Sequence, residues 1–177
     1  RYAIVAAGFE AGRFLPENVM KLTSTYAIIS QPVDERHLWP GRALLWETGT
    51  PYLYVRTDGN RILVGGGDVD FRDPVRRDKL LRKKVAVLER KFRKLFPAIP
   101  FVTDMAWCGT FSSTADGLPL IGPWPGHPRM LYALGYGGNG ITFSMIAAQV
   151  LTNLIAGADD PRREVFGFQR LSVAPKR

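Results

Sequence analysis

The 177-residue chain is predicted to have an α+β fold, in which a mainly antiparallel sheet with one long helix across it lies between α/β elements at both ends. Three observations predict this class. Short strand-like segments separated by turn residues fill the middle of the chain, which is typical of antiparallel sheets. A basic segment over residues 76–94 carries apolar residues at helical spacing. Near the C-terminal end, a strand-like run, a glycine cluster and an apolar helical segment follow one another.

The middle of the chain supplies the strands of the antiparallel sheet. The candidates are residues 22–33, 44–46, 52–56, 61–65 and 101–107. Between two of them, Thr57-Asp58-Gly59-Asn60 indicates a hairpin, because an Asp-Gly pair adopts positive φ readily. The following run Gly65-Gly66-Gly67-Asp68 is expected to leave the strand.

The basic segment 76–94 predicts a surface helix. It holds ten lysines and arginines and two acids, so its excess of positive charge equals the +8 of the whole chain. Apolar residues at helical spacing would face the sheet and leave the charges in solvent. These apolar residues are Leu81, Val85, Leu88, Phe92 and Leu95. No nucleic-acid-binding motif accompanies the charge, so neither a nucleic-acid partner nor membrane association is expected.

The two ends of the chain predict the α/β elements. Residues 2–8 form a continuous apolar run that ends in glycine, as strands buried on both faces do. At the other end, a strand-like run over 130–135 is followed by a glycine cluster and by an apolar helix over 141–156, which Gly157 ends. This helix is shorter than a membrane span and contains polar residues, so it is expected to be buried inside a domain. Residues 172–177 are expected to form a frayed tail.

Few residues suggest chemistry on their own. Cys108 is the only cysteine, so no internal disulfide is possible and a buried structural thiol is expected. His37 and His127 lie in loops without the spacing of a metal site, and no metal is expected. No signal peptide is apparent, and a cytoplasmic location is expected. The absence of a starting methionine fits a chain cut from a longer protein.

Motifs in a fixed order resemble the C-terminal half of the D-amino-acid-oxidase-like FAD-dependent oxidoreductases, the group that includes glycine oxidase and sarcosine oxidase. The resemblance covers about residues 1–171. Its motifs are Ala-Ala-Gly near the start, Tyr-x-Tyr-x-Arg with Asp-Gly-x-Arg-Ile, Trp-x-Gly-x4-Thr-x-Asp-Gly-x-Pro-x-Ile-Gly over 107–122, and Gly-x-Gly-Gly-x-Gly over 135–140. No G-x-G-x-x-G follows a first strand, so the chain resembles part of such an enzyme.

The resemblance implies FAD as the cofactor. Residues 1–24 and 108–171 would then belong to a partial, Rossmann-like FAD domain, and residues 25–107 to a substrate domain. Glycines ahead of the last helix would let backbone N–H groups and the helix N-terminus approach the negative charge of reduced flavin, whereas a tight turn packed for steric reasons is the alternative. For Asp116, satisfying the amides of its own turn is an equal alternative. The residues implied to contact the cofactor are Ala7, Gly8, Gly109, Asp116, Gly117, Pro119, Gly135, Gly137, Gly138, Asn139, Gly140 and Ile141.

The implied substrate is a small amine or amino acid whose C–N bond is oxidised by hydride transfer to flavin. The residues implied near it are Tyr52, Tyr54, Arg56, Phe111 and Tyr136. Glycine-oxidase-like members bind the substrate carboxylate with an arginine at positions where this chain has Phe111 and Gly138. Either the substrate lacks a carboxylate there, or Arg56 binds it. In a third interpretation, Tyr52 and Tyr54 pack in the core of the domain and Arg56 forms an ion pair on the surface.

The chain alone is expected to bind FAD weakly or not at all and to be inactive. The resemblance implies that the adenosine and pyrophosphate site is missing, so the N-terminal FAD-binding segment would be its partner. No residue is assigned a catalytic role, because in hydride transfer to flavin the protein mainly orients and desolvates the substrate. The alternative function is a cofactor-free binding or interaction module derived from a flavoenzyme substrate domain.

Overall fold

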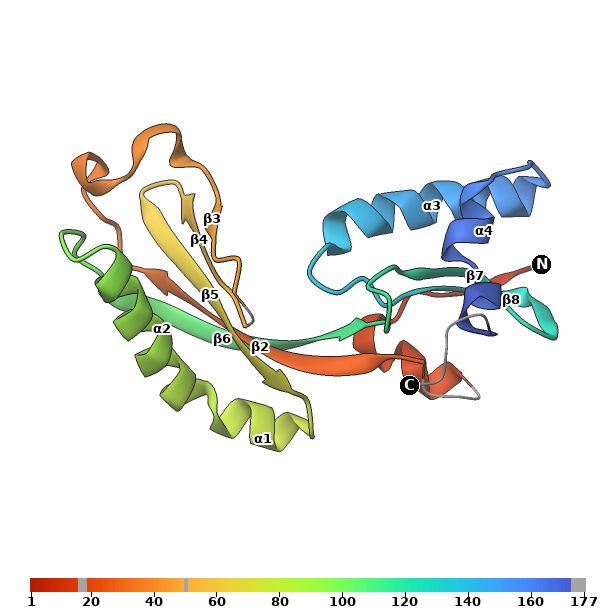
Figure 1. Ribbon diagram of the computed structural model, residues 1–177, viewed down its shortest axis with the longest axis horizontal. Coiled ribbons are helices and arrows are strands. Elements are labelled where there is room, and N and C mark those ends of the chain that lie inside the picture. Colours follow the sequence, from red (N-terminus) through yellow and green to blue (C-terminus); the bar gives the residue numbers. More distant parts are fainter. Residues whose placement is uncertain (16–18, 50, 173–177) are drawn as a thin grey trace. The chain divides into compact units, whose positions relative to one another are not determined.

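The computed structural model describes residues 1–15, 19–49 and 51–172, and the chain forms two compact units (Figure 1). The central unit is Thr23–Thr110, and the terminal unit joins Arg1–Leu22 to Phe111–Arg177. Each unit has a sheet and helices, which confirms the predicted α+β class. Most of the expected tail, residues 173–177, lies outside the described residues. In the part of the chain that is described, no helix is long and apolar enough to cross a membrane.

The central unit is built on a five-stranded sheet with the strand order β3-β4-β5-β2-β6. The neighbours β3 and β4, β4 and β5, and β2 and β5 are antiparallel. The β4–β5 hairpin turns at Gly59, whose φ is 58°, where the sequence predicted a turn. The strands are β2 (Lys21–Ser30), β3 (Leu45–Trp46), β4 (Leu53–Asp58), β5 (Arg61–Asp70) and β6 (Thr103–Ser113), and the short 3-10 helices η2 (Glu35–His37) and η3 (Pro40–Arg42) precede β3.

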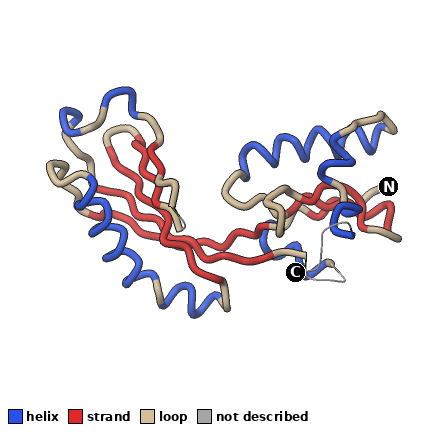
Figure 2. Tube along the Cα trace, viewed as in Figure 1, coloured by secondary structure: helices blue, strands red, loops and turns tan. Residues whose placement is uncertain are grey.

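Helices α1 (Pro74–Lys79) and α2 (Leu81–Leu95) cover one face of this sheet (Figures 1 and 2). Leu88 and Phe92 of α2 are buried in a core with side chains from β2, β4 and β5. Two details of the helix prediction were wrong. The helix is interrupted at Leu80, whose N–H is shared among three carbonyls of the turn before it, and Leu95 is exposed.

β5 continues through the glycine run that was expected to end it. The pairing of β2 with β5 changes register between Ser24 and Tyr26, so that Gly67 and Asp68 together lie opposite Thr25. This arrangement is a β-bulge, in which Gly67 has a φ of 67°, a left-handed conformation that glycine adopts without steric cost. The glycines therefore bend the strand without terminating it.

The terminal unit contains a three-stranded sheet with the order β1-β8-β7, in which β1 is parallel and β7 antiparallel to β8. Side chains of β8 alternate between two cores, as the two-residue repeat of a strand requires. Leu131 and Ala133 pack with α3, whereas Tyr132 and Leu134 pack with Phe168 on the other side. The elements are β1 (Ala3–Val5), η1 (Gly8–Phe14), β7 (Leu120–Trp124), β8 (His127–Leu134), α3 (Gly140–Ala156), α4 (Arg162–Phe166) and η4 (Phe168–Ser172).

β1 and α3 are less buried than the sequence predicted. β1 lies at the edge of its sheet, with a single neighbouring strand among the described residues, and Ile4 is 52% exposed. α3 packs one face on the sheet but leaves Ile141 and Met145 exposed. Its C-terminal end agrees with the prediction, because Gly157 follows it in the left-handed conformation.

Candidate functional site

The glycine-rich segment between β8 and α3 forms a tight turn. Gly135 and Gly137 have φ values of 78° and 54°, which other residues rarely adopt. A side chain at Gly135 would come within 2.9 Å of the Thr114 side chain. The N–H of Gly137 donates to the Ser112 carbonyl at 2.8 Å. Glycine at these two positions is therefore required by the turn itself.

The N-terminus of α3 suits a negatively charged group. The first N–H groups of a helix have no acceptor within the helix, and the side chain of the N-cap Asn139 makes no capping hydrogen bond. No acidic residue lies in the first turn. A Cβ at Gly140 would meet nothing within 4 Å, so the approach to these donors is open. Open donors at the positive end of a helix fit the anionic N1 and O2 region of reduced flavin.

The glycines of this segment have the spacing of a dinucleotide-binding motif but not its structural context. Gly135, Gly137 and Gly140 match the pattern G-x-G-x-x-G and lie between a strand and a helix. In a dinucleotide-binding βαβ unit, a parallel strand follows the helix. Here α3 is followed by α4 and η4, and no strand comes after α3 within the described residues. The spacing alone therefore does not make this segment a pyrophosphate site.

Asp116 organises the turn before β7. Its Oδ1 accepts hydrogen bonds from the Leu118 N–H at 3.1 Å and the Thr114 hydroxyl at 2.9 Å. Its Oδ2 accepts one from Arg170 Nε at 2.7 Å. The hydrogen bond from Arg170 is the main cause that lowers the Asp116 pKa to about 2. Asp116 thus satisfies its own turn, the alternative left open by the sequence, and its contact with a cofactor stays a prediction.

The remaining cofactor candidates are distributed over both units. Ala7 and Gly8 lie where β1 gives way to η1, and Gly8 has a φ of 57°. Gly109 lies in β6 within the central unit, where a Cβ would contact Thr25 at 3.7 Å. The others lie in the terminal unit. These are Gly117 (φ 75°) in the Asp116 turn, the buried Pro119, and the exposed Gly138, Asn139 and Ile141 at the start of α3.

Tyr52 and Tyr54 belong to an aromatic cluster on the central sheet. Leu53 and Val55 enter the core beneath α2, so Tyr54 between them points to the opposite face. The ring centroids of Tyr52 and Tyr54 are 6.3 Å apart, and the Trp46 ring lies 6.4 Å from that of Tyr52. Burial is the main cause that raises the pKa of both tyrosines. The structure therefore brings these two predicted residues together, with Trp46 as an unpredicted third.

Arg56 lies two residues beyond Tyr54 on β4 but is engaged locally. Its guanidinium donates to the Thr57 carbonyl at 3.2 Å and lies 3.8 Å from the Asp58 carboxylate. This is the surface ion pair that the sequence left open, and a role in binding a substrate carboxylate stays a prediction. Of the other two substrate candidates, both in the terminal unit, Tyr136 packs 6.3 Å from the Phe143 ring and Phe111 is partly buried.

Asp68 is a candidate that the sequence reasoning missed. Its Oδ1 atom is buried and has no hydrogen-bond partner among the described residues. Burial raises the pKa of Asp68, although Thr25 and Lys84 oppose the shift. Its charge also raises the pKa of Tyr52 and Tyr54, which indicates that it lies near them. The available signal was an acid directly after three glycines, which was interpreted as the end of a strand.

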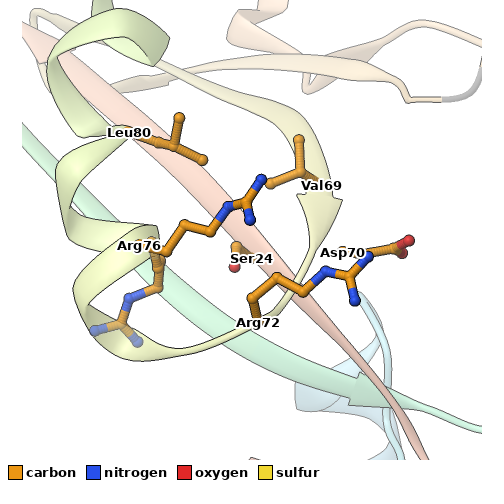
Figure 3. Close-up of a pocket in the computed structure, with 7 residues that line it drawn as sticks. Ser24, Val69, Asp70, Arg72, Arg76 and Leu80 are labelled. Atoms are coloured by element: carbon orange, nitrogen blue, oxygen red, sulfur yellow. The ribbon is translucent and has the colours of Figure 1, made fainter.

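A hollow of the central unit has several arginines in its lining (Figure 3). It has a volume of about 220 Å³ and is lined by Ser24, Val69, Asp70, Arg72, Arg76, Arg77 and Leu80. The Arg77 guanidinium is hydrogen-bonded within the protein, because it donates to the Asp78 carboxylate at 2.8 Å and to the Thr110 hydroxyl at 3.0 Å. The Cys108 thiol donates to the same carboxylate at 3.2 Å, and burial is the main cause that raises its pKa. Cys108 is only partly buried, contrary to the expectation of a buried thiol, and its structural role stays a prediction.

Comparison with known proteins places these features in a class of enzymes. Residues 1–154 match the family described as FAD dependent oxidoreductase, and the chain belongs to that family, which confirms the resemblance. Glycine oxidase of Pseudomonas putida is 31% identical over 111 residues, covering 61% of this chain and 29% of that protein. Gamma-glutamylputrescine oxidoreductase of Escherichia coli is 32% identical over 175 residues, covering 94% of this chain and 39% of that protein. The chain thus spans well under half the length of these relatives.

Solved structures share the fold. L-proline dehydrogenase from P. horikoshii aligns over 98% of this chain and 48% of its own, with a TM-score of 0.77 and 18% identity. Glycine oxidase from Geobacillus kaustophilus aligns over 98% of this chain and 45% of its own, with a TM-score of 0.68 and 19% identity. At these identities the likeness establishes the fold, while FAD as the family's cofactor follows from the family match.

Proposed function

We propose that this chain supplies the substrate-binding sheet and part of the flavin site of an enzyme that oxidises the C–N bond of an amine or amino acid. In this proposal the central unit is the substrate domain and the terminal unit is part of the FAD domain. The observation that carries the proposal is the open N-terminus of α3 behind its glycine turn, in a chain whose family uses FAD.

The turn and the helix have separate roles in this proposal. The N–H groups of Gly137 and Asn139 already donate to the carbonyls of Ser112 and Tyr136, so these residues shape the turn. The donors left for an anionic cofactor are the first-turn N–H groups of α3, from Gly140 onward. The chemistry that FAD supplies when bound is acceptance of a hydride from the carbon next to the substrate nitrogen. The chain's own contribution is to fix the position of that group and to stabilise negative charge on it.

The aromatic cluster on the central sheet would hold the organic part of the substrate. Tyr52, Tyr54 and Trp46 present rings to one face, and rings exclude water while contacting an alkyl chain. A small-molecule amine or amino acid is therefore the proposed partner. The adenosine and pyrophosphate parts of FAD would be bound by a segment outside residues 1–177, since no parallel strand follows the glycine turn and α3 in the described part of the chain. A cytoplasmic location also stays a prediction.

Flavin capture tests the proposal. The purified chain, and the same chain extended N-terminally within its parent protein, are incubated with excess FAD, passed through gel filtration and examined by visible absorption. We expect the extended form to retain the absorption spectrum of a bound flavin. In the absence of oxygen, amines or amino acids should reduce this flavin and bleach its absorption. A colourless extended form would contradict the proposal, and it would favour a cofactor-free binding module.

A single methyl group tests the position of the flavin. Gly140→Ala places a Cβ in open space at the first position of α3, where alanine favours the helix, so the variant should fold. We expect it to retain less flavin than the unchanged protein, because the methyl group narrows the approach to the N–H donors. Gly49→Ala is the matched control, since a Cβ there also meets nothing within 4 Å but lies in the central unit. Equal flavin retention by both variants would argue against this position.

A further inference from the structure

Asp68 lies at a point where the backbone departs from regular pairing. Gly67 and Asp68 form the wide side of the β-bulge opposite Thr25. A bulge turns the side chain of its second residue away from the direction that strict alternation would give, and bulges occur often beside functional sites. Here the re-aimed side chain is a carboxylate near Tyr52 and Tyr54, whose pKa values its charge raises.

One oxygen of the Asp68 carboxylate, Oδ1, is buried and lacks a hydrogen-bond donor in the described ranges. The nearby cation, Lys84, donates to the Gly67 carbonyl and lies over the Tyr26 ring, 5.3 Å from its centroid. Thr25 supplies a hydrogen bond that favours the charged carboxylate. A buried carboxylate oxygen without a donor is costly, so its presence calls for a ligand that supplies one.

We propose that Asp68 binds a protonated amine group of the substrate. An ammonium donates hydrogen bonds to a carboxylate, and the neighbouring rings of Tyr52 and Tyr54 stabilise a cation through their faces. Because Oδ1 is closed off from solvent, a covering side chain must turn aside as the ligand enters. The guanidinium of Arg56 pairs with Asp58, which agrees with a site that binds a cation and not a carboxylate.

The bound ammonium is a different group from the nitrogen that is oxidised. Loss of hydride from the adjacent carbon requires the nitrogen lone pair, so the reacting amine must be neutral. A carboxylate contact favours the protonated form of an amine and would oppose that step at the reacting nitrogen. The substrate class is therefore a diamine or another amine with a second amino group that is protonated at neutral pH. This inference rests on the proposed function and specifies the substrate class of that function.

Binding of 1,4-diaminobutane to the whole chain tests the charge contact. Calorimetry compares this diamine with 1,4-butanediol, which has a similar length without charge. We expect the diamine to bind more tightly than the diol and to lose roughly ten- to a hundredfold in affinity in Asp68→Asn, the range for a hydrogen bond to a charged group. Asp34→Asn is the matched control, because it removes the same charge from an exposed N-cap that asparagine also forms. Equal diamine affinity in Asp68→Asn and Asp34→Asn would overturn the inference.

A measurement on the unchanged chain guards against a variant that does not fold. Carbon-13 NMR of the Asp68 carboxyl should show its pKa falling when 1,4-diaminobutane is added, since a bound cation favours the charged form. An Asp68 pKa that the diamine does not move would contradict the proposal.

Turnover by the flavin-loaded, extended protein tests the second amine. The kcat/KM for 1,4-diaminobutane should fall roughly tenfold or more in Asp68→Asn, while that for n-butylamine should change less than about twofold. Equal losses for both amines would overturn the assignment of a second amino group. An extended protein that captures no flavin would refute the proposed function, and the binding measurements would still decide whether Asp68 holds a cation.

Discussion

The ring of Tyr54 lies on Gly65, its partner across the β4–β5 pair, so closely that a Cβ at Gly65 would overlap two ring carbons and the hydroxyl oxygen of Tyr54. Gly65 is buried and has an ordinary strand conformation, so backbone freedom does not explain the glycine. The missing side chain makes room for the ring instead. The position of Tyr54 in the aromatic cluster therefore depends on glycine at residue 65.

Gly65→Ala is expected to lower the free energy of unfolding by about 1–3 kcal/mol, the usual cost of inserting a methyl group into a packed site. Urea unfolding measures this change. In a Tyr54→Ala background the cost should largely disappear, because the ring that the methyl group displaces is absent. Gly49→Ala, with open space around its Cβ, should change stability by less than about 0.5 kcal/mol. Equal costs of Gly65→Ala with and without Tyr54 would show that the ring is not responsible.

Local patterns in the sequence predicted most elements of the fold. Alternation and turn residues indicated the β4–β5 hairpin, and the helical spacing of Leu88 and Phe92 identified the face of α2 that packs on the sheet. The bulge at Gly67 was beyond local reasoning, because glycines end strands and also interrupt them, and the pairing strand 40 residues away decides between the two. The same limit applies to β1, whose apolar run predicts burial without saying which neighbours surround it.

The sequence predicted the candidate site only in part, because local patterns do not show which strands pair. The glycine turn before α3 has a sequence signal, since strand, glycines and helix are consecutive. Tyr52 and Tyr54 were found from their alternation on one strand. Asp68 was missed because its significance comes from a missing hydrogen-bond partner, which depends on contacts between strands. Asp116, by contrast, was identified from its local turn, whereas its partner Arg170 lies 54 residues further along the chain.

The Asp116–Arg170 contact predicts a loss of stability in acid. The Asp116 pKa of about 2 lies below its ordinary value of 3.8, mainly through the Arg170 hydrogen bond. A carboxyl group with a lowered folded-state pKa stabilises the fold fully above its unfolded pKa and ceases to do so as pH falls through the folded pKa. The contribution of Asp116 should therefore be complete above about pH 4 and decline between about pH 4 and 2. Thermal unfolding from pH 6 to pH 2 follows the decline.

Two single variants isolate this contribution. Asp116→Asn keeps an oxygen that accepts from the Leu118 N–H but removes the charge, and Arg170→Gln removes the cation. Each should lower the melting temperature at pH 6 and make it less sensitive to pH between 4 and 2 than in the unchanged chain. The lowered pKa of Asp160, beside Arg162, leaves part of the acid sensitivity in both variants. A steeper acid loss in Asp116→Asn than in the unchanged chain would contradict the assignment.

Phe92 and Leu95 have nearly the same position in the apolar repeat of α2, yet the structure assigns them opposite energetic roles. Phe92 is fully buried, with its ring centroid 4.6 Å from that of Phe101 and 5.1 Å from that of Phe96. Leu95 is 49% exposed at the last position of the helix. Phe92→Ala should therefore lower the free energy of unfolding by about 3–5 kcal/mol, because it removes buried area and leaves a cavity.

Leu95→Ala is the matched control, and it should cost less than about 1 kcal/mol, because much of the side chain already contacts water. Alanine also has a slightly higher helix propensity than leucine, which offsets part of that loss. Urea unfolding of both variants distinguishes the structure from the sequence pattern, which placed the two residues on one buried stripe. Comparable losses of several kcal/mol in both variants would mean that Leu95 is buried in solution by something beyond the contacts described here.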